Sequence, residues 1–399
     1  FYMKKISFIV ESFFSDYYRK RYHIDFYKKK KIKIKILNVS KITRPKYFYH
    51  FRKKIKTFEE KIIDNNNLER ELIKLKKSDL VIVLIGRTIC TKKIFNILEK
   101  EKIDYSLMFY SSVPLLNRTN YEIVRDIFLH PISGIMHAFH VFEYRRNKFS
   151  IKPKNIFYSG RKVYLDSKKE FSNAKFISVP HPDLDSILID QRKKTKLIKK
   201  FCRPVFIKAG IEPSGHYTHS DNFFSPKKFP PERLALDEEK HYAPLRLFFK
   251  DFCSVNNSKG VNIAEHPKRQ VEYPEDRTNF LKMGSNYFGK TLELTKNSNF
   301  VITFFSTAIN FAILSYKPIM FLTSDDFMFL EKRRIKIMAK FFDKKPFNCS
   351  REKFDNERYL YEKKINFKKY DQYIKDFIFD KKPSNLSCEI LLNFIERKS

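Results

Sequence analysis

The sequence contains no tryptophan and only 8 glycines among its 399 residues. The scarcity of glycine matters at the first strand-to-helix turn, where a dinucleotide-binding domain places G-x-G-x-x-G. Here that turn reads IVESFFSDYY, from Ile9 to Tyr18, without a single glycine. The G-x-S-x-G turn of the α/β-hydrolases is missing from the whole chain. These two absences exclude a Rossmann-type dehydrogenase and a serine hydrolase of that fold.

Cysteine is also scarce. The five cysteines, none of them in C-x-x-C spacing, are Cys90, Cys202, Cys253, Cys349 and Cys388. An odd number without regular spacing argues against a disulfide framework or a zinc site and fits a reducing compartment. No apolar run reaches the ~18 residues of a membrane-spanning helix, and the short apolar start predicts a first strand instead of a signal peptide. We therefore expect a cytoplasmic protein whose contact with the inner face of a membrane is peripheral.

Basic residues dominate the charge, because 81 Lys and Arg stand against 45 Asp and Glu and leave a net charge of +36. A biased genomic composition explains part of this excess, since Ile, Asn, Phe and Tyr are abundant too. Alternatively, basic faces serve phosphate-bearing ligands or an anionic membrane. A nucleic-acid-binding protein is a further alternative. However, the basic residues are spread over the whole chain without a known nucleic-acid motif, so we expect no nucleic-acid partner.

Metal-binding patterns are weak. His130, His137 and His140 would share a metal only on a continuous helix, and a proline and a glycine stand between them. The one D-x-D triplet, at 183–185, follows a proline near the expected domain junction instead of ending a strand. We expect no metal and no other cofactor.

Strand and helix patterns alternate along the chain. Buried strand patterns at 6–10, 78–86 and 105–110 are separated by helical patterns at 15–29, 57–77 and 91–102, and the alternation continues to 179 and restarts after 204. The run KIKIKILNV at 31–39 predicts an edge or half-exposed strand. Such alternation predicts parallel sheets covered by helices, in two α/β domains that meet near 193–203.

The most informative stretch is NSNFVITFFSTAINFAILSYKPIMFLTS, at 297–324. It predicts a buried strand at 300–305, a helix at 308–316 and a second strand at 319–322. Ser306 and Thr307 follow the first strand directly, and hydroxyl residues are favoured helix N-caps. Backbone amides and the helix dipole at such a turn attract an anion.

A second polar strand end lies about forty residues upstream. The segment VNIAEHPK predicts a buried strand that runs out into Glu265 and His266. Two strand ends that both carry polar groups suggest one crevice, because open α/β sheets bind ligands at the carboxyl ends of their strands.

EHPK at Glu265–Lys268 and FFSTAINFAI at Phe304–Ile313 resemble the His-Pro and Ser-Ser/Thr motifs of bacterial capsule and sialic-acid-type glycosyltransferases, a group that is Kdo-transferase-like. The N-terminal strand with its Glu-Ser turn and the HPDLD segment at 181–185 carry the same likeness, which covers most of the chain. The resemblance implies an α/β protein of GT-B type, with two Rossmann-like, doubly wound parallel-sheet domains facing a cleft. We expect an acceptor domain at 1–195 and a donor domain at 196–345. Helices at 346–399 would pack back on the core.

The resemblance also implies roles for individual residues. His266 would contact the donor phosphate, or protonate it as a leaving group, which is a task that suits an imidazole. The residues expected to bind the donor phosphate or nucleotide are Gly210, Glu265, Pro267, Lys268, Ser306 and Thr307. For the base that activates an acceptor hydroxyl, Glu11 and Glu212 are the two candidates, one at the end of the first strand of each half.

The resulting prediction is a glycosyltransferase of surface-carbohydrate or capsule biosynthesis. It would move a nucleotide-activated sugar, CMP-sugars included, onto a surface polysaccharide or a lipid-linked glycan acceptor. Three alternatives stay open: a polyol-phosphate transferase of similar build, a basic nucleic-acid-binding protein and a non-catalytic paralogue.

Overall fold

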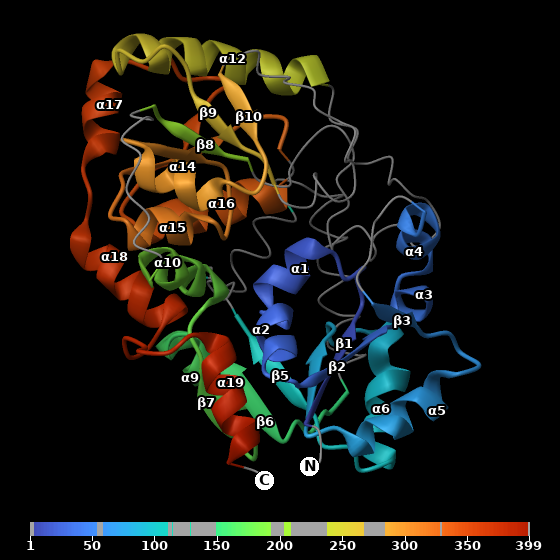
Figure 1. The fold of residues 1–399 in the computed structure, drawn as a ribbon. Helices are drawn as coiled ribbons and strands as arrows, with labels where there is room; N and C mark the ends of the chain where they lie inside the picture. Colours follow the sequence, from blue (N-terminus) through green and yellow to red (C-terminus); the bar gives the residue numbers. More distant parts are fainter. Residues whose placement is uncertain are drawn as a thin grey trace. The chain divides into compact units, whose positions relative to one another are not determined.

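The protein is described from a computed structural model, for residues 4–53, 59–110, 114, 128, 149–192, 203–208, 238–266, 284–327 and 329–397. The chain divides into two compact units (Figure 1). Unit 1 takes the described residues within Phe1–Ser111, Asn117–Pro182 and Phe379–Ser399, and unit 2 those within Ser112–Leu116 and Asp183–Ile378. The junction expected at 193–203 falls almost wholly outside the described residues.

Unit 1 is built on a seven-stranded parallel sheet in the order β3-β2-β1-β4-β5-β6-β7. Its strands are β1 (Lys5–Val10), β2 (Lys33–Asn38), β3 (Glu60–Ile62), β4 (Leu80–Leu84), β5 (Ser106–Phe109), β6 (Asn155–Tyr158) and β7 (Lys175–Ser178). The central β1 and β4 consist mainly of aliphatic and aromatic residues and are buried along most of their length. Such strands require cover on both faces, which the helices provide.

The described helices of unit 1 are α1 (Asp16–Arg21), α2 (Ile24–Lys29), α3 (Ser40–Thr43), α4 (Pro45–Phe51), α5 (Leu68–Ile73), η1 (Lys74–Lys77), η2 (Ile89–Thr91), α6 (Lys92–Lys100), α9 (Arg161–Glu170) and α19 (Ser387–Glu396). The core joins strand residues such as Ile9 and Val83 to helix residues such as Phe95. The late helix α19 returns to this unit, where the ring of Phe394 lies 5.5 Å from that of Phe157 on β6.

Unit 2 is built on a six-stranded parallel sheet in the order β10-β9-β8-β11-β12-β13. Its strands are β8 (Val205–Ile207), β9 (Asn262–Ala264), β10 (Ser285–Tyr287), β11 (Val301–Thr303), β12 (Ile319–Thr323) and β13 (Phe347–Asn348). Its helices are α12 (Glu238–Val255), α14 (Thr291–Asn297), α15 (Ile309–Leu314), α16 (Phe329–Phe341), α17 (Asn356–Lys363), α18 (Phe367–Tyr373) and the π-helical turn η4 (Ile374–Ile378). Helix α10 (Pro182–Arg192) begins at the boundary between the units.

The predicted α/β class with two Rossmann-like parallel sheets is confirmed. Of the two alternatives predicted for 31–39, an edge or a half-exposed strand, the half-exposed strand is confirmed, since β2 lies between β1 and β3. Its half-exposed character has a clear cause. The short β3 pairs only with Ile36–Asn38, so the lysine-bearing first half of β2 has no neighbour on that side in the described sheet.

Two predicted helices are also interrupted. The stretch at 15–29 forms α1 and α2, which are separated at His23, where the backbone takes a left-handed φ of 51°. Within the stretch predicted as one helix at 57–77, residues 60–62 form β3 before α5 begins. Short strands of this kind carry too few residues for their periodicity to be recognised.

Candidate active site

The strand order of each sheet reverses beside its first strand. In unit 1 the reversal lies between β1 and β4, and in unit 2 it lies between β8 and β11. The carboxyl ends of strands at such a reversal form the usual ligand site of an open α/β sheet. In unit 1, Glu11 follows β1. In unit 2, Lys208 follows β8 and Ser306 lies three residues after β11.

A buried ion pair lies at the carboxyl ends of two neighbouring strands in unit 2. The Lys208 ammonium lies 3.5 Å from Glu265 Oε1, and the two side chains are 5% and 0% exposed. The backbone holds both residues in place, since the Lys208 amide donates to the Ala264 carbonyl and the Glu265 amide donates to the Tyr287 carbonyl. The Lys208 ammonium also lies 5.6 Å above the ring of Tyr242 on α12. The Lys208 ammonium is thus held at the carboxyl ends of the strands and is shielded there from solvent.

His266 directly follows Glu265 and is partly exposed, as a residue that meets a ligand would be. A second histidine was not predicted as a site residue. His241 on α12 is 1% exposed, its Nδ1 lies 3.9 Å from Asp326 Oδ2, and its ring packs 5.5 Å from that of Phe327. Its position was hidden in the sequence because it falls inside an amphipathic helix. Gly210, Glu212, Pro267 and Lys268 lie outside the described residues.

The turn after β11 is built differently from the predicted capped helix. Helix α15 begins at Ile309 with Ala308 at its N-cap, so Ser306 and Thr307 precede the cap. Ser306 Oγ accepts a hydrogen bond from the Ala308 amide at 3.2 Å, which closes a serine turn instead of a cap. The helix has only six residues, so its dipole is small. Ser306 is partly exposed and Thr307 is exposed, and both come shortly after the end of β11.

A buried polar network supports this turn within unit 2. Asn310 on α15 donates to Asp183 Oδ2 at 2.9 Å and accepts from the Tyr373 hydroxyl at 3.1 Å. Asn310 and Tyr373 are completely buried, and Asp183 is 9% exposed. Burial and the Asp183 charge raise the pKa of Tyr373, so its hydroxyl stays protonated and remains a donor. The network fixes the start of α15 and therefore the turn before it.

The sequence contains a phosphate-loop spacing, although no such motif was predicted. Gly284–Thr291 reads GSNYFGKT, which fits the pattern G-x-x-x-x-G-K-T. The structure does not form a phosphate loop there, because the middle of the segment is strand β10, paired with β9. Gly284 and Gly289 both have positive φ, and a Cβ on Gly284 would lie 1.7 Å from the Val261 carbonyl oxygen. That glycine is therefore explained by close backbone packing.

Glu11 bridges the strand reversal of unit 1. Its Oε1 accepts a hydrogen bond at 3.2 Å from the amide of Gly86, two residues after the end of β4. Arg44 lies beside it and donates to Ser12 Oγ at 3.3 Å. Burial raises the pKa of Glu11, while the Arg44 charge and the Gly86 amide oppose that rise. A raised pKa makes the carboxylate a stronger base than that of an exposed glutamate, which suits a general base.

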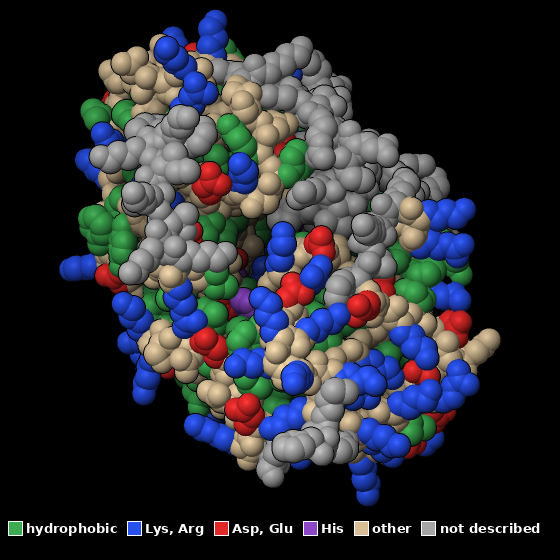
Figure 2. All heavy atoms as spheres, in the orientation of Figure 1, with side chains coloured by type: hydrophobic (Ala, Val, Ile, Leu, Met, Phe, Trp, Pro, Cys, Tyr) green, Lys and Arg blue, Asp and Glu red, His purple; other side chains and the backbone are tan. Residues whose placement is uncertain are grey.

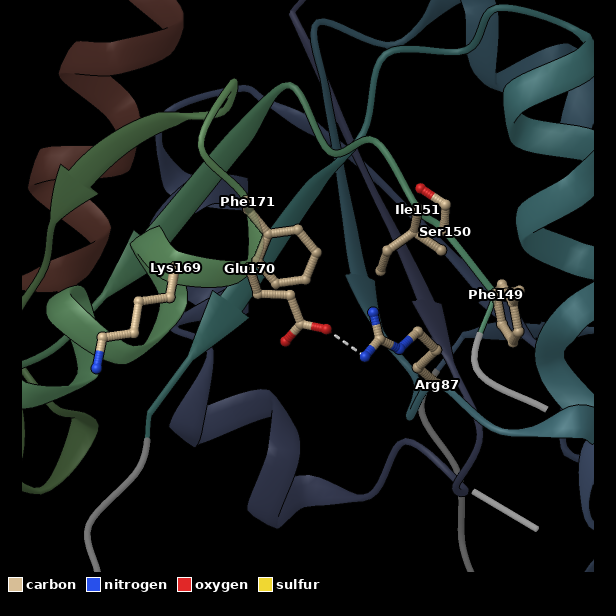
Figure 3. A pocket seen from close by; sticks show the side chains of 7 residues that line it. All are labelled: Arg87, Phe149, Ser150, Ile151, Lys169, Glu170 and Phe171. Atoms are coloured by element: carbon tan, nitrogen blue, oxygen red, sulfur yellow. Dashed lines mark hydrogen bonds and ion pairs between the residues drawn. The ribbon is translucent and has the colours of Figure 1, made fainter. Parts of the chain in front are cut away.

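A pocket of about 560 Å³ lies next to this turn in unit 1 (Figure 3). Arg87, which directly follows Gly86, forms an ion pair with Glu170 at the end of α9. The remaining lining residues are Phe149, Ser150, Ile151, Lys169 and Phe171. The ion pair neutralises its own charges, so the pocket combines apolar surface with a polar wall.

Metal ligands and membrane-spanning helices were searched among the described residues. No group of three or more His, Cys, Asp or Glu side chains in that part of the chain is placed to hold a metal ion. The three histidines at 130–140 lie outside it. No helix within the described ranges is both long and apolar enough to cross a bilayer.

The fold of this chain resembles the folds of several solved structures. A variant of the wall teichoic acid polymerase TagF has a TM-score of 0.50 at 12% identity, over 99% of this chain and 88% of that one. MurG of Acinetobacter baumannii has a TM-score of 0.47 at 10% identity, over 99% of both chains. MnaA of S. aureus, solved with UDP, has a TM-score of 0.46 at 13% identity, over 99% of this chain and 97% of that one. No protein-family model and no curated protein matches the sequence. The likeness to TagF, together with the two parallel sheets, identifies a GT-B-type fold.

Proposed function

We propose that this protein is a glycosyltransferase that uses a nucleotide-activated sugar. The observation that carries the proposal is the set of polar residues at the strand reversal of unit 2. Lys208 lies in a buried ion pair with Glu265, His266 directly follows Glu265, and Ser306 and Thr307 follow β11, the strand beside β8. A cation, an imidazole and hydroxyl groups are the groups that hold and protonate a departing phosphate.

In this proposal unit 2 binds the donor and unit 1 binds the acceptor. His266 donates a proton or a hydrogen bond to the leaving phosphate, and Ser306 and Thr307 bind its oxygens. Glu11 in unit 1 takes the proton of the acceptor hydroxyl. The pocket beside Arg87 would receive part of a glycan or lipid-linked acceptor, because it offers both apolar and polar surface. The excess of basic residues favours a peripheral contact with an anionic membrane.

Donor binding tests the proposal. The purified protein is titrated with CMP-, UDP-, GDP- and dTDP-sugars, and we expect one nucleotide class to bind. His266→Ala should then weaken binding or abolish transfer, whereas His23→Asn, at a histidine of unit 1, should leave both unchanged. If no nucleotide sugar binds, or if His266→Ala binds and transfers like the unaltered protein, the proposal fails.

A polyol-phosphate transferase is the second candidate, because the fold is shared with a wall teichoic acid polymerase. The same cation and imidazole would serve the transfer of a phosphoryl-linked unit. Product analysis separates the two candidates, since a glycosyltransferase forms a glycosidic bond and the alternative forms a phosphodiester.

A further inference from the structure

A lysine-lined pocket lies at the amino ends of the central strands of unit 1, at the sheet edge opposite Glu11. Lys5 begins β1, Lys33 begins β2, and the two are direct neighbours in the register of the sheet. The pocket has a volume of about 510 Å³. Its lining residues are Lys5, Lys33, Ile34, Lys35, Lys74 and Lys77. In Figure 2, Lys and Arg side chains gather over the part of unit 1 that carries α5 and α6.

The nearby carboxylates are already engaged. Glu71 on α5 is 1% exposed, and its two oxygens contact the ammonium groups of Lys74 at 2.7 Å, Lys61 at 3.0 Å and Lys35 at 3.2 Å. These ion pairs overcome the effect of burial and lower the pKa of Glu71 to about 2. Asp79 Oδ2 accepts from the backbone amide of Lys5 at 2.6 Å. The two carboxylates therefore neutralise only part of the lysine charge.

The remaining lysines of the pocket repel one another electrostatically. Within the described residues, Lys5, Lys33 and Lys77 form no ion pair with a carboxylate. Burial lowers the pKa of Lys5, the charges of Lys35, Lys33 and Lys77 lower it further, and the Asp79 charge opposes them. Like charges held together in a partly enclosed site raise the free energy of the empty pocket. A bound anion would relieve this repulsion at several lysines at once.

We propose that this lysine pocket binds a polyvalent phosphate anion. Its volume exceeds the need of a single phosphate, and its positive charges come from three separate chain segments. Lysine acts on phosphate as a point charge, so the pocket can accept linked phosphate groups of more than one geometry. The same chemistry occurs in free pyrophosphate and in the headgroup of an anionic lipid. This site belongs to unit 1 and does not depend on the donor site proposed for unit 2.

The test removes two of the lysines that form no ion pair. Pyrophosphate is titrated calorimetrically into the protein with its lysine pocket intact, into Lys33→Ala/Lys77→Ala and into the control Lys29→Ala/Lys93→Ala. The control removes the same charge from two exposed positions on α2 and α6. All three are prepared in a His266→Ala background, so that binding at the proposed donor site is suppressed. We expect the pocket variant to bind about tenfold more weakly and the control to bind normally.

A second arm identifies the source of the phosphate. Sedimentation with vesicles that contain cardiolipin, whose headgroup joins two phosphates, is compared with sedimentation with phosphatidylcholine vesicles for the same three proteins. If the pocket variant loses only pyrophosphate binding, the result supports a free anion; if it loses only the cardiolipin interaction, the result supports a lipid headgroup; and if it loses both, the pocket takes either source. If the pocket variant matches the control in both arms, the proposal is overturned.

Discussion

The Lys208 ammonium lies 3.5 Å from Glu265 Oε1, and both side chains are almost completely removed from solvent. Each residue directly follows a strand, Lys208 after β8 and Glu265 after β9, and the two strands are neighbours in the sheet of unit 2. Removing charges from water is costly, and a pair of this kind offsets that cost only while both partners are present. Breaking the pair should therefore destabilise the carboxyl ends of β8 and β9, where the proposed donor site lies.

Lys208→Met should lower the free energy of unfolding by about 3–5 kcal/mol, because it leaves the Glu265 carboxylate buried without this partner. The double variant Lys208→Met/Glu265→Leu should recover part of that loss. Urea unfolding followed by circular dichroism measures both effects. If the losses measured for Lys208→Met alone and for Glu265→Leu alone add up to the loss of the double variant, the two charges are not coupled.

A buried amide in the same unit should be similarly sensitive. Asn310→Leu removes a hydrogen-bond partner from both Asp183 and Tyr373 and should cost ~2–4 kcal/mol, because it takes a donor away from a nearly buried carboxylate. Tyr373→Phe removes a single hydrogen bond and should cost about 1 kcal/mol.

Tyr316→Phe is the matched control for Tyr373→Phe. The Tyr316 hydroxyl donates to Asp371, but this side chain is 43% exposed. Water replaces such a bond, so unfolding should shift by less than ~0.5 kcal/mol. Equal losses for the two tyrosine variants would contradict a structural role for the buried network.

The fall of the transfer rate at acidic pH, which is the acid limb of the pH–rate profile, should reflect the protonation of Glu11. Burial raises the pKa of this carboxyl above its ordinary value of 4.5, so the basic form is lost at a higher pH than for an exposed glutamate. Glu11→Gln should reduce the transfer rate by about 10²-fold or more while donor binding persists. Arg44→Met removes a charge that lowers the pKa of Glu11, so the acid limb should move to higher pH.

The pH–rate profile of each variant measures this shift. Arg52→Met serves as the control, since this substitution removes the same charge from an exposed position. An acid limb that stays in place in Arg44→Met would exclude Glu11 as the group that titrates.

Glu71 should make stability depend on pH. Its pKa is lowered from 4.5 to about 2 in the folded chain, so its stabilising effect is complete above pH 4.5 and is lost as the pH falls toward 2. Glu71→Gln should lower the free energy of unfolding by ~1–3 kcal/mol at pH 7 and by much less near pH 2. Urea unfolding across this range tests the slope. The variant Glu69→Gln, which removes an exposed partner of Lys100, should leave the slope unchanged.

Long buried strands were predictable because their apolar runs are unbroken. The patterns at 6–10, 78–86 and 319–322 coincide with β1, β4 and β12. Such runs do not reveal the order of the strands in the sheet. The alternation at 31–39 therefore predicted an edge or a half-exposed strand without distinguishing the two, and β3 lies beside only the second half of β2. The three-residue β3 and β10 have too little length for a periodic signal, and β10 lies inside a segment whose letters suggest a phosphate loop.

The site was predictable only in part. Glu11, Glu265 and Ser306 were identified because each comes soon after a buried strand, and the structure describes them there. Lys208 follows a strand in the same way, but a lysine is a weak signal in a chain with 81 basic residues. Its pairing with Glu265 depends on the adjacency of β8 and β9, which is a tertiary fact. Whether these residues act in catalysis stays a prediction.

Helix α19 packs in unit 1, although residues 183–378, nearly all of unit 2, precede it in the chain. During synthesis, unit 2 therefore leaves the ribosome with all its residues before unit 1 has received its last helix. Domains usually fold as they emerge, from the amino terminus onward. Here the unit that emerges first completes its core last, so until translation has passed Glu396 the apolar surface around Phe157 lacks its cover.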